Sequence, residues 1–157
     1  MTEQVDVAIV GAGFGGMYML HRAREAGMSA VVFERGSDVG GTWFWNRYPG
    51  ARCDVPSMEY SYQFSDELQQ EWEWSEKYAT QPEILRYAQH VAERFDLKRD
   101  IRFQTSVVSL HFNEEDNTWL VTPSQGGQVR ATFVVTAMGC LSSANKPRFA
   151  NDEQFRG

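Results

Sequence analysis

A glycine-rich turn between two short apolar runs constrains the fold of this chain more than any other feature. The runs cover residues 5–10 and 30–33, and the glycines between them have the spacing G-x-G-x-x-G at Gly11, Gly13 and Gly16. Short runs rich in β-branched residues are typical of buried strands, and residues 14–26 are helix-forming. In such a strand–turn–helix unit the glycines permit a tight turn, close approach of backbone to a pyrophosphate, and close packing of helix on strand.

The acid that follows the second run supports a nucleotide ligand. Glu34 lies 18 residues after Gly16, where a carboxylate can accept hydrogen bonds from a ribose 2′-OH and would repel a 2′-phosphate. The helix that begins near Phe14 would direct its free N–H groups at the phosphates. We therefore expect FAD or NAD rather than NADP at this turn, and the motif does not separate those two. The alternative is a glycine-rich turn without a ligand.

Bulk properties exclude several classes of partner. The chain has 157 residues, enough for one domain with a core, and its net charge of −6 argues against nucleic acid or an anionic membrane. No apolar run has the length of a membrane span, and the N-terminus lacks a signal-peptide pattern. The two cysteines, Cys53 and Cys140, have no metal-ligand spacing. We expect a cytoplasmic protein that binds no metal.

Residues 36–56 are expected to form a long ordered loop, because glycine, proline and polar residues interrupt any regular element. Its aromatic content argues against disorder. We interpret it as a wall around a flat ring system, with Gly40 and Gly41 admitting the ligand and Arg52 and Asp54 supplying charge. The alternative is a purely structural loop stapled by aromatic side chains.

The rest of the chain predicts an α/β fold with a parallel sheet, helices and an inserted antiparallel β-meander. Ser65 is a candidate helix N-cap, and a more strongly marked helix begins at residues 80–83. The periodicity then changes to short strands at residues 101–103, 107–112, 118–122 and 128–131, with a final parallel strand at 132–136. Residues 142–147 have the composition of a linker.

The loop also carries a family resemblance. Residues 40–54 match the Baeyer–Villiger monooxygenase signature [A/G]-G-x-W-x-x-x-x-[F/Y]-P-[G/M]-x-x-x-D at every fixed position, which are Gly40, Gly41, Trp43, Tyr48, Pro49, Gly50 and Asp54. Residues 59–62, 70–72, 81–87 and 139–142 are similar to the cyclohexanone and phenylacetone monooxygenase branch. The chain resembles this family over essentially its whole length.

The resemblance implies a Rossmann-like FAD-binding domain of a flavoprotein with two dinucleotide-binding domains. Residues 1–144 would form the N-terminal part of the FAD domain, and residues 145–157 a linker toward an NADPH domain. The family reduces FAD with NADPH, reacts with O₂ and converts ketones to esters or lactones. A ketone, O₂ and the remaining part of the protein are thus the implied partners.

The resemblance also assigns cofactor contacts to individual residues. They are Gly11, Gly13, Gly15, Gly16, Glu34, Gly41, Thr42, Trp43, Trp45, Arg52, Cys53, Asp54, Tyr60 and Val107. Glu34 would hold the adenosine ribose, the backbone at Val107 would meet the adenine, and residues 42–45 would line the flavin side with Tyr60. Residues 52–54 would face the nicotinamide nucleotide.

Asp54 is the one candidate catalytic position, because in the family a carboxylate here positions an arginine that stabilises the oxygenating species. That arginine is absent from this chain. The chain ends at Phe155–Gly157, the first three positions of a second family signature. We therefore expect an N-terminal fragment that is inactive alone. The alternatives are a stand-alone flavin-binding module, an inactive fragment, or a flavin monooxygenase that oxidises nitrogen or sulfur.

Overall fold

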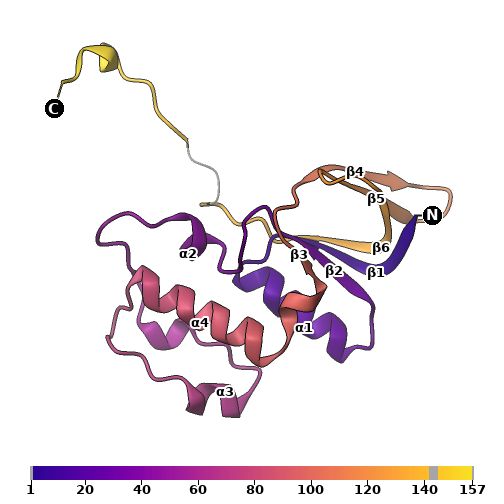
Figure 1. Ribbon diagram of the computed structural model, residues 1–157, viewed down its shortest axis with the longest axis horizontal. Helices are drawn as coiled ribbons and strands as arrows, with labels where there is room; N and C mark the ends of the chain where they lie inside the picture. Colours follow the sequence, from indigo (N-terminus) through magenta and orange to yellow (C-terminus); the bar gives the residue numbers. More distant parts are fainter. Residues whose placement is uncertain (1, 142–144, 157) are drawn as a thin grey trace.

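A mixed six-stranded sheet in the order β3-β2-β1-β6-β5-β4 forms the centre of the molecule (Figure 1). The computed structural model describes residues 2–141 and 145–156. The strands are β1 (Glu3–Val10), β2 (Ala30–Phe33), β3 (Ile101–Arg102), β4 (Val107–Asn113), β5 (Thr118–Pro123) and β6 (Val129–Thr136). The helices are α1 (Phe14–Glu25), α2 (Thr42–Trp45), α3 (Asp66–Glu71) and α4 (Gln81–Arg94), with 3₁₀ turns at Ser57–Tyr60, Leu97–Asp100 and Asp152–Gln154. Within the described ranges, no helix is long and apolar enough to cross a membrane.

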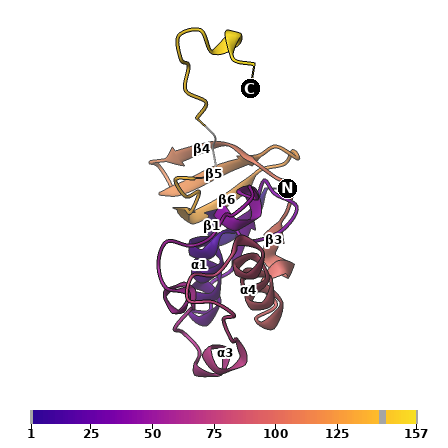
Figure 2. The same cartoon turned by 90° about the vertical axis from the view of Figure 1, so that its left-hand side faces the viewer.

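Helices α1 and α4 cover one face of the parallel strands (Figure 2). β1 pairs in parallel with both β2 and β6, so the glycine-rich turn leaves the sheet from a central strand. Met17 and Leu20 of α1 are fully buried against Ile9 and Val32, and Ala88 of α4 joins the same cluster. The predicted strand–helix–strand unit is therefore confirmed, with α1 ending at Glu25.

The opposite face is covered by the antiparallel part of the sheet. Ala8, Val31 and Phe33 pack there with Val121 of β5 and Val129 of β6. Figure 2 shows β4 and β5 on the side away from α1 and α4. Both faces of the parallel strands are thus buried, as expected from their continuous apolar runs.

The predicted boundary between the meander and the last parallel strand was wrong. Residues 128–131 and 132–136 were expected as two strands, but β6 is one continuous strand. It pairs in parallel with β1 along its length, while Val129–Ala131 also pair antiparallel with β5. The strand can serve both partners because each of its edges has its own row of hydrogen-bonding groups.

The prediction that residues 36–56 contain no regular structure was also wrong. One helical turn, α2, begins after Gly41, whose backbone has φ +54°. Phe44 and Trp45 donate their backbone N–H groups to the carbonyl of Gly41, and the Trp43 side chain is buried. Burial of the indole compensates for a segment whose composition is unfavourable for a helix.

Two of the helix starts agree with the sequence. The Ser65 hydroxyl accepts a hydrogen bond from the Leu68 N–H at 3.2 Å, as an N-cap does. Thr80 occupies the N-cap of α4 without a side-chain bond, and proline stands in the first turn. Ser142 to Ala144, part of the predicted linker and its domain boundary, lie outside the described residues.

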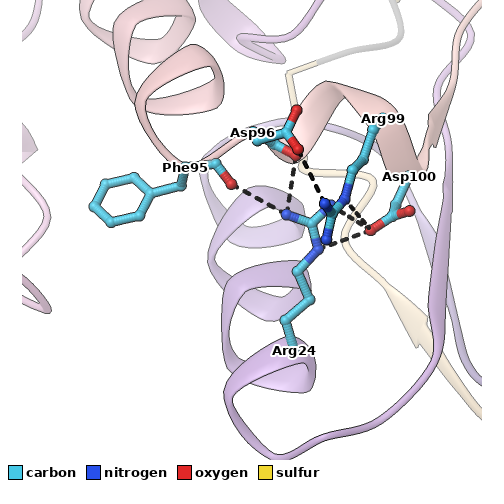
Figure 3. Close-up of polar contacts among 5 residues, drawn as sticks. All are labelled: Arg24, Phe95, Asp96, Arg99 and Asp100. Carbon is cyan, nitrogen blue, oxygen red and sulfur yellow. Dashed lines mark hydrogen bonds and ion pairs between the residues drawn. The ribbon is translucent and has the colours of Figure 1, made fainter.

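Arg24 of α1 fixes the end of α4 (Figure 3). Its guanidinium donates to the carbonyl oxygens of Phe95 at 3.1 Å and Asp96 at 3.0 Å, where the last carbonyls of the helix need partners. It also forms an ion pair with Asp100, which Arg99 approaches at 3.7 Å. These contacts join α1 to the C-terminal end of α4 and to the Leu97–Asp100 turn that precedes β3.

Candidate functional site

A cavity of about 570 Å³ opens at the carboxyl ends of β1, β2 and β6. In open α/β sheets this edge is where ligands bind. The cavity is lined by Val10, Gly11, Gly13, Phe14, Gly15, Phe33, Glu34, Arg35, Gly40, Gly41, Thr42, Trp43, Trp45, Tyr60, Thr105, Ser106, Val107, Ala137, Met138 and Gly139. It is therefore bounded by the glycine turn, the loop after β2, and the segments before β4 and after β6.

The glycine turn is closed against its neighbours so tightly that side chains are excluded. Gly11 has φ +100°, and a Cβ there would lie 2.7 Å from the carbonyl oxygen of Ala137. A Cβ on Gly16 would lie 1.8 Å from the carbonyl oxygen of Gly11. Gly11, Gly13 and Gly15 line the cavity where α1 begins, whereas Gly16 does not. The turn presents bare backbone to the cavity, which suits a phosphate group.

The loop after β2 lies directly on this turn. The Gly40 N–H donates to the carbonyl of Ala12 at 3.1 Å. A Cβ on Gly41 would come within 2.8 Å of the Gly13 Cα. The family-signature loop and the glycine turn, separated by a complete helix and strand in the sequence, therefore form one continuous wall.

Glu34 directly follows β2 and forms hydrogen bonds with both the glycine turn and the loop after β2. Its carboxylate accepts hydrogen bonds from the backbone N–H of Ala12 at 2.7 Å and of Gly36 at 2.6 Å, and the residue is only 5% exposed. Each oxygen keeps a second lone pair, and Glu34 lines the cavity. The carboxylate can therefore accept hydrogen bonds from ligand hydroxyl groups while it holds the turn in place.

Aromatic side chains form the other end of the cavity. The rings of Trp43 and Tyr60 meet edge to face with centroids 5.5 Å apart, and Phe14 meets Tyr60 at 5.7 Å. Burial raises the pKa of Tyr60, and the nearby Cys53 and Asp54 raise it further. The phenol therefore stays neutral near neutral pH and can donate a hydrogen bond into the cavity.

The structure brings most of the residues predicted to bind cofactor into this one wall. They are Gly11, Gly13, Gly15, Glu34, Gly41, Thr42, Trp43, Trp45, Tyr60 and Val107. Gly16 does not line the cavity, because it packs under Gly11 instead.

The predicted residues 52–54 lie outside the cavity wall. Cys53 is buried in a cluster with Trp43 and Ile84. Arg52 is exposed and donates to Glu76 and to the carbonyl of Tyr78, both at 2.9 Å. Asp54 is exposed as well. The side chains of Arg52 and Asp54 thus face solvent outside this cavity, whereas Cys53 belongs to the core.

Several lining residues were missed from the sequence. Arg35 adjoins Glu34 and could have been found by its position. Thr105 and Ser106 gave no local signal, because long-range bonds place them. The Thr105 N–H donates to the Glu34 carbonyl at 2.8 Å, and the Ser106 N–H to the Ser124 hydroxyl at 3.0 Å.

Comparison with known proteins agrees with the geometry. Residues 8–156 match the family model described as pyridine nucleotide-disulphide oxidoreductase. A Baeyer–Villiger monooxygenase of Pseudooceanicola batsensis is 44% identical over 153 residues, which cover 97% of this chain and 28% of that protein.

Solved structures give the same result. An oxidized steroid monooxygenase bound to NADP is 57% identical, with a TM-score of 0.90 over 96% of this chain and 29% of that chain. A complex of OTEMO with FAD and NADP is 40% identical, with a TM-score of 0.88 over 98% of this chain and 29% of that one. The chain thus spans less than a third of the length of these relatives. It belongs to the pyridine nucleotide-disulphide oxidoreductase family, and the predicted resemblance to Baeyer–Villiger monooxygenases is confirmed.

Proposed function

We propose that this chain is the FAD-binding part of an NADPH- and O₂-dependent flavin monooxygenase that oxidises ketones to esters or lactones. The observation that carries the proposal is the joint wall made by Glu34, the bare glycine turn and Gly41 at the carboxyl ends of parallel strands. Relatives of similar sequence include a Baeyer–Villiger monooxygenase and a complex that holds both FAD and NADP. When bound, FAD supplies the oxygen activation on which the reaction depends.

The residues of the cavity fit this cofactor along its length. The N-terminus of α1 and the turn at Gly11–Gly15 would hold the diphosphate. Glu34 would accept hydrogen bonds from the adenosine ribose, and the backbone at Val107 would meet the adenine. Thr42 and the aromatic pair of Trp43 and Tyr60 would border the isoalloxazine.

The exposed residues beside the cavity are assigned to the second nucleotide. We place Arg52 and Asp54, with the buried Cys53 between them, on the side that NADPH approaches. Asp54 would position an arginine supplied by another part of the complete protein. Residues 1–144 would then be the FAD-binding portion, and residues 145–157 the connection to an NADPH-binding portion.

The complete protein's partners follow from this assignment. They are a small ketone, O₂, NADPH and the remaining part of the polypeptide. We also propose a cytoplasmic location, since the described cysteines are free thiols, which reducing compartments maintain.

A spectroscopic titration tests cofactor choice. The 157-residue chain is mixed with FAD, separated from free ligand, and examined in the visible range, with NAD as the competing dinucleotide. Retention of FAD and indifference to NAD are expected. A folded chain that takes up NAD tightly and leaves FAD free would overturn the proposal.

Turnover assays test the reaction. NADPH should not bleach flavin bound to this chain alone, because hydride delivery is assigned to the remaining part. A complete protein that contains this sequence should convert a cyclic ketone to a lactone with consumption of NADPH. Oxidation of an amine or sulfide instead of the ketone would favour the other class of flavin monooxygenase.

A further inference from the structure

The peptide unit between Phe14 and Gly15, in the first turn of α1, receives a hydrogen bond from outside the helix. The Tyr62 hydroxyl donates to the backbone carbonyl of Phe14 at 2.6 Å. A helix carbonyl accepts the N–H four residues further on, and its second lone pair stays available. Tyr62 therefore adds a side-chain donor to a carbonyl that lies just after the glycine turn.

The same peptide unit carries the N–H of Gly15, which is exposed and lines the cavity. The first bond of the helix runs from the Met17 N–H to the Gly13 carbonyl at 2.9 Å, so the Gly15 N–H precedes the bonded part of α1. The C=O and N–H of a trans peptide unit point in opposite directions, and helix N–H groups point toward the N-terminus. Tyr62 therefore contacts one end of a peptide unit whose other end is directed at the cavity.

Tyr62 is itself fixed in place by α4 and by the Phe14 ring. Its backbone N–H donates to the hydroxyl of Tyr87 at 2.7 Å, and Tyr87 is fully buried. Its ring stacks on that of Phe14 with centroids 5.4 Å apart and an angle of 28° between the ring planes. Burial raises the pKa of Tyr62, and the neighbouring Tyr87 raises it further. The phenol therefore keeps its proton at physiological pH and remains a hydrogen-bond donor to Phe14.

A donor at the carbonyl end of an amide affects the N–H end of the same amide. Linked hydrogen bonds polarise one another, so the bond from Tyr62 makes the Gly15 N–H a stronger donor. A charged phosphate oxygen gains more from a stronger donor than a neutral hydroxyl or base does. The bond also restricts rotation of the peptide unit, which keeps the N–H aimed at the cavity before a ligand binds.

We propose that Tyr62 is a positioning residue for the diphosphate of the dinucleotide: its bond to the Phe14 carbonyl orients and polarises the Gly15 N–H that donates to a phosphate oxygen. The inference rests on the proposed function, because it takes the cavity as the dinucleotide site. Tyr62 does not line the cavity, so it acts through the peptide unit and not by touching the ligand.

Two neighbouring tyrosines offer matched controls. The exposed ring of Tyr18 stacks on Tyr62 with centroids 6.3 Å apart, so Tyr18→Phe removes a hydroxyl from the same cluster without removing the bond to Phe14. Tyr87→Phe removes the buried hydroxyl that accepts the Tyr62 N–H, which should lower stability while the Tyr62 hydroxyl still reaches Phe14. A general effect on packing would therefore appear in Tyr87→Phe, whereas a specific effect on Gly15 appears only in Tyr62→Phe.

The test combines amide NMR with isothermal titration of the full 157-residue chain. In ligand-free Tyr62→Phe the Gly15 amide nitrogen signal should move upfield, because the preceding carbonyl has lost a donor. ADP and FAD should bind about threefold to tenfold more weakly, as expected for one hydrogen bond. Adenosine and riboflavin should bind as they do to the unmodified chain. Tyr18→Phe and Tyr87→Phe should retain the Gly15 signal and the affinity for ADP, and Tyr87→Phe should melt at a lower temperature.

Each contrary outcome has its own meaning. An unchanged Gly15 signal or an unchanged ADP affinity in Tyr62→Phe overturns the inference and leaves the proposed function intact. Equal loss for ADP and adenosine, or an equal loss of ADP affinity in Tyr87→Phe, would show a general effect on the fold and overturns it as well. If the unmodified chain binds neither FAD nor ADP, the proposed function fails and the inference with it.

A second variant covers the case in which Tyr62→Phe does not fold, which circular dichroism detects. Incorporation of 3-fluorotyrosine at position 62 keeps the phenol and makes it a stronger donor. It should move the Gly15 amide nitrogen signal downfield and tighten the binding of ADP. An upfield shift or weaker binding of ADP in this folded variant would contradict the role assigned to Tyr62.

Discussion

The backbones of Gly13 and Gly41 are in direct contact, so that a Cβ on Gly41 would lie 2.8 Å from the Gly13 Cα. This contact joins the turn after β1 to the loop after β2, although the two glycines are 28 positions apart in the sequence. Neither segment can shift independently of the other. The shape of the cavity therefore depends on glycine at position 41, where the positive φ and this close contact exclude a side chain.

Replacement of Gly41 tests that dependence. Gly41→Ala should lower the affinity for FAD by about tenfold or more, because the methyl group must separate the two segments. Gly50→Ala is the control: Gly50 also has a positive φ, of +81°, but a Cβ there meets nothing within 4 Å. Both variants should lose about 1–2 kcal/mol of unfolding free energy from backbone strain, measured in urea, and Gly41→Ala should lose more because of its contact with Gly13. Equal FAD affinity in the two variants would show that the contact does not shape the cavity.

Adjacent glycines in α1 should separate folding from binding. Gly16→Ala should unfold the chain or lower its melting temperature severely, because the added Cβ would lie 1.8 Å from the Gly11 carbonyl oxygen. Gly15→Ala should fold normally, since its Cβ would meet only the Ala137 Cβ at 4.0 Å, while its methyl group enters the cavity and weakens FAD. Thermal melts followed by circular dichroism, together with a flavin titration, measure both effects. A stable Gly16→Ala variant would contradict the packing described above.

Glu34 is expected to act on both stability and binding. In Glu34→Gln an amide NH₂ group replaces one of the two carboxylate oxygens, and this group cannot accept the hydrogen bond from the backbone N–H that the oxygen accepts. The unfolding free energy without ligand should therefore fall by about 1–3 kcal/mol. Affinity for FAD should fall as well. Glu83 provides the control, because its buried carboxylate accepts hydrogen bonds from the N–H and hydroxyl of Ser75, both at 2.8 Å, away from the cavity. Glu83→Gln should lose stability while its affinity for FAD is retained. If Glu83→Gln and Glu34→Gln lost FAD affinity equally, the assignment of Glu34 to the ligand site would be wrong.

His21 should make the stability of the chain depend on acidity. Its ring stacks on Phe64 with centroids 4.1 Å apart, and burial lowers its pKa below the ordinary value of 6.5. As the pH falls through that range, the unfolded chain takes up the proton first, so the free energy of unfolding decreases. His21→Phe should keep the stack and reduce this loss when urea unfolding is compared at about pH 7.5 and about pH 5.5. An unchanged slope in His21→Phe would contradict the assignment.

Much of the local structure follows from the sequence. The short apolar runs, the glycine spacing and the cap residues predict β1, α1, β2, α3 and α4, because each signal comes from residues within one or two turns of one another. The signature loop and the acid after β2 also predict much of the cavity wall. The sequence reveals these positions because the local conformation and hydrogen bonding of the backbone restrict which residues can occupy them.

The tertiary structure decided what depends on distant partners. The sequence did not predict that β6 would serve both halves of the sheet, nor that one turn of helix would form around the buried Trp43. It also did not predict that Arg52 and Cys53 would lie off the cavity while Thr105 joins it. The reason is that strand pairing, burial and hydrogen bonds such as that from Ala12 to Glu34 form between segments far apart in the chain. Local periodicity therefore determined the elements, and the contacts between them determined the site.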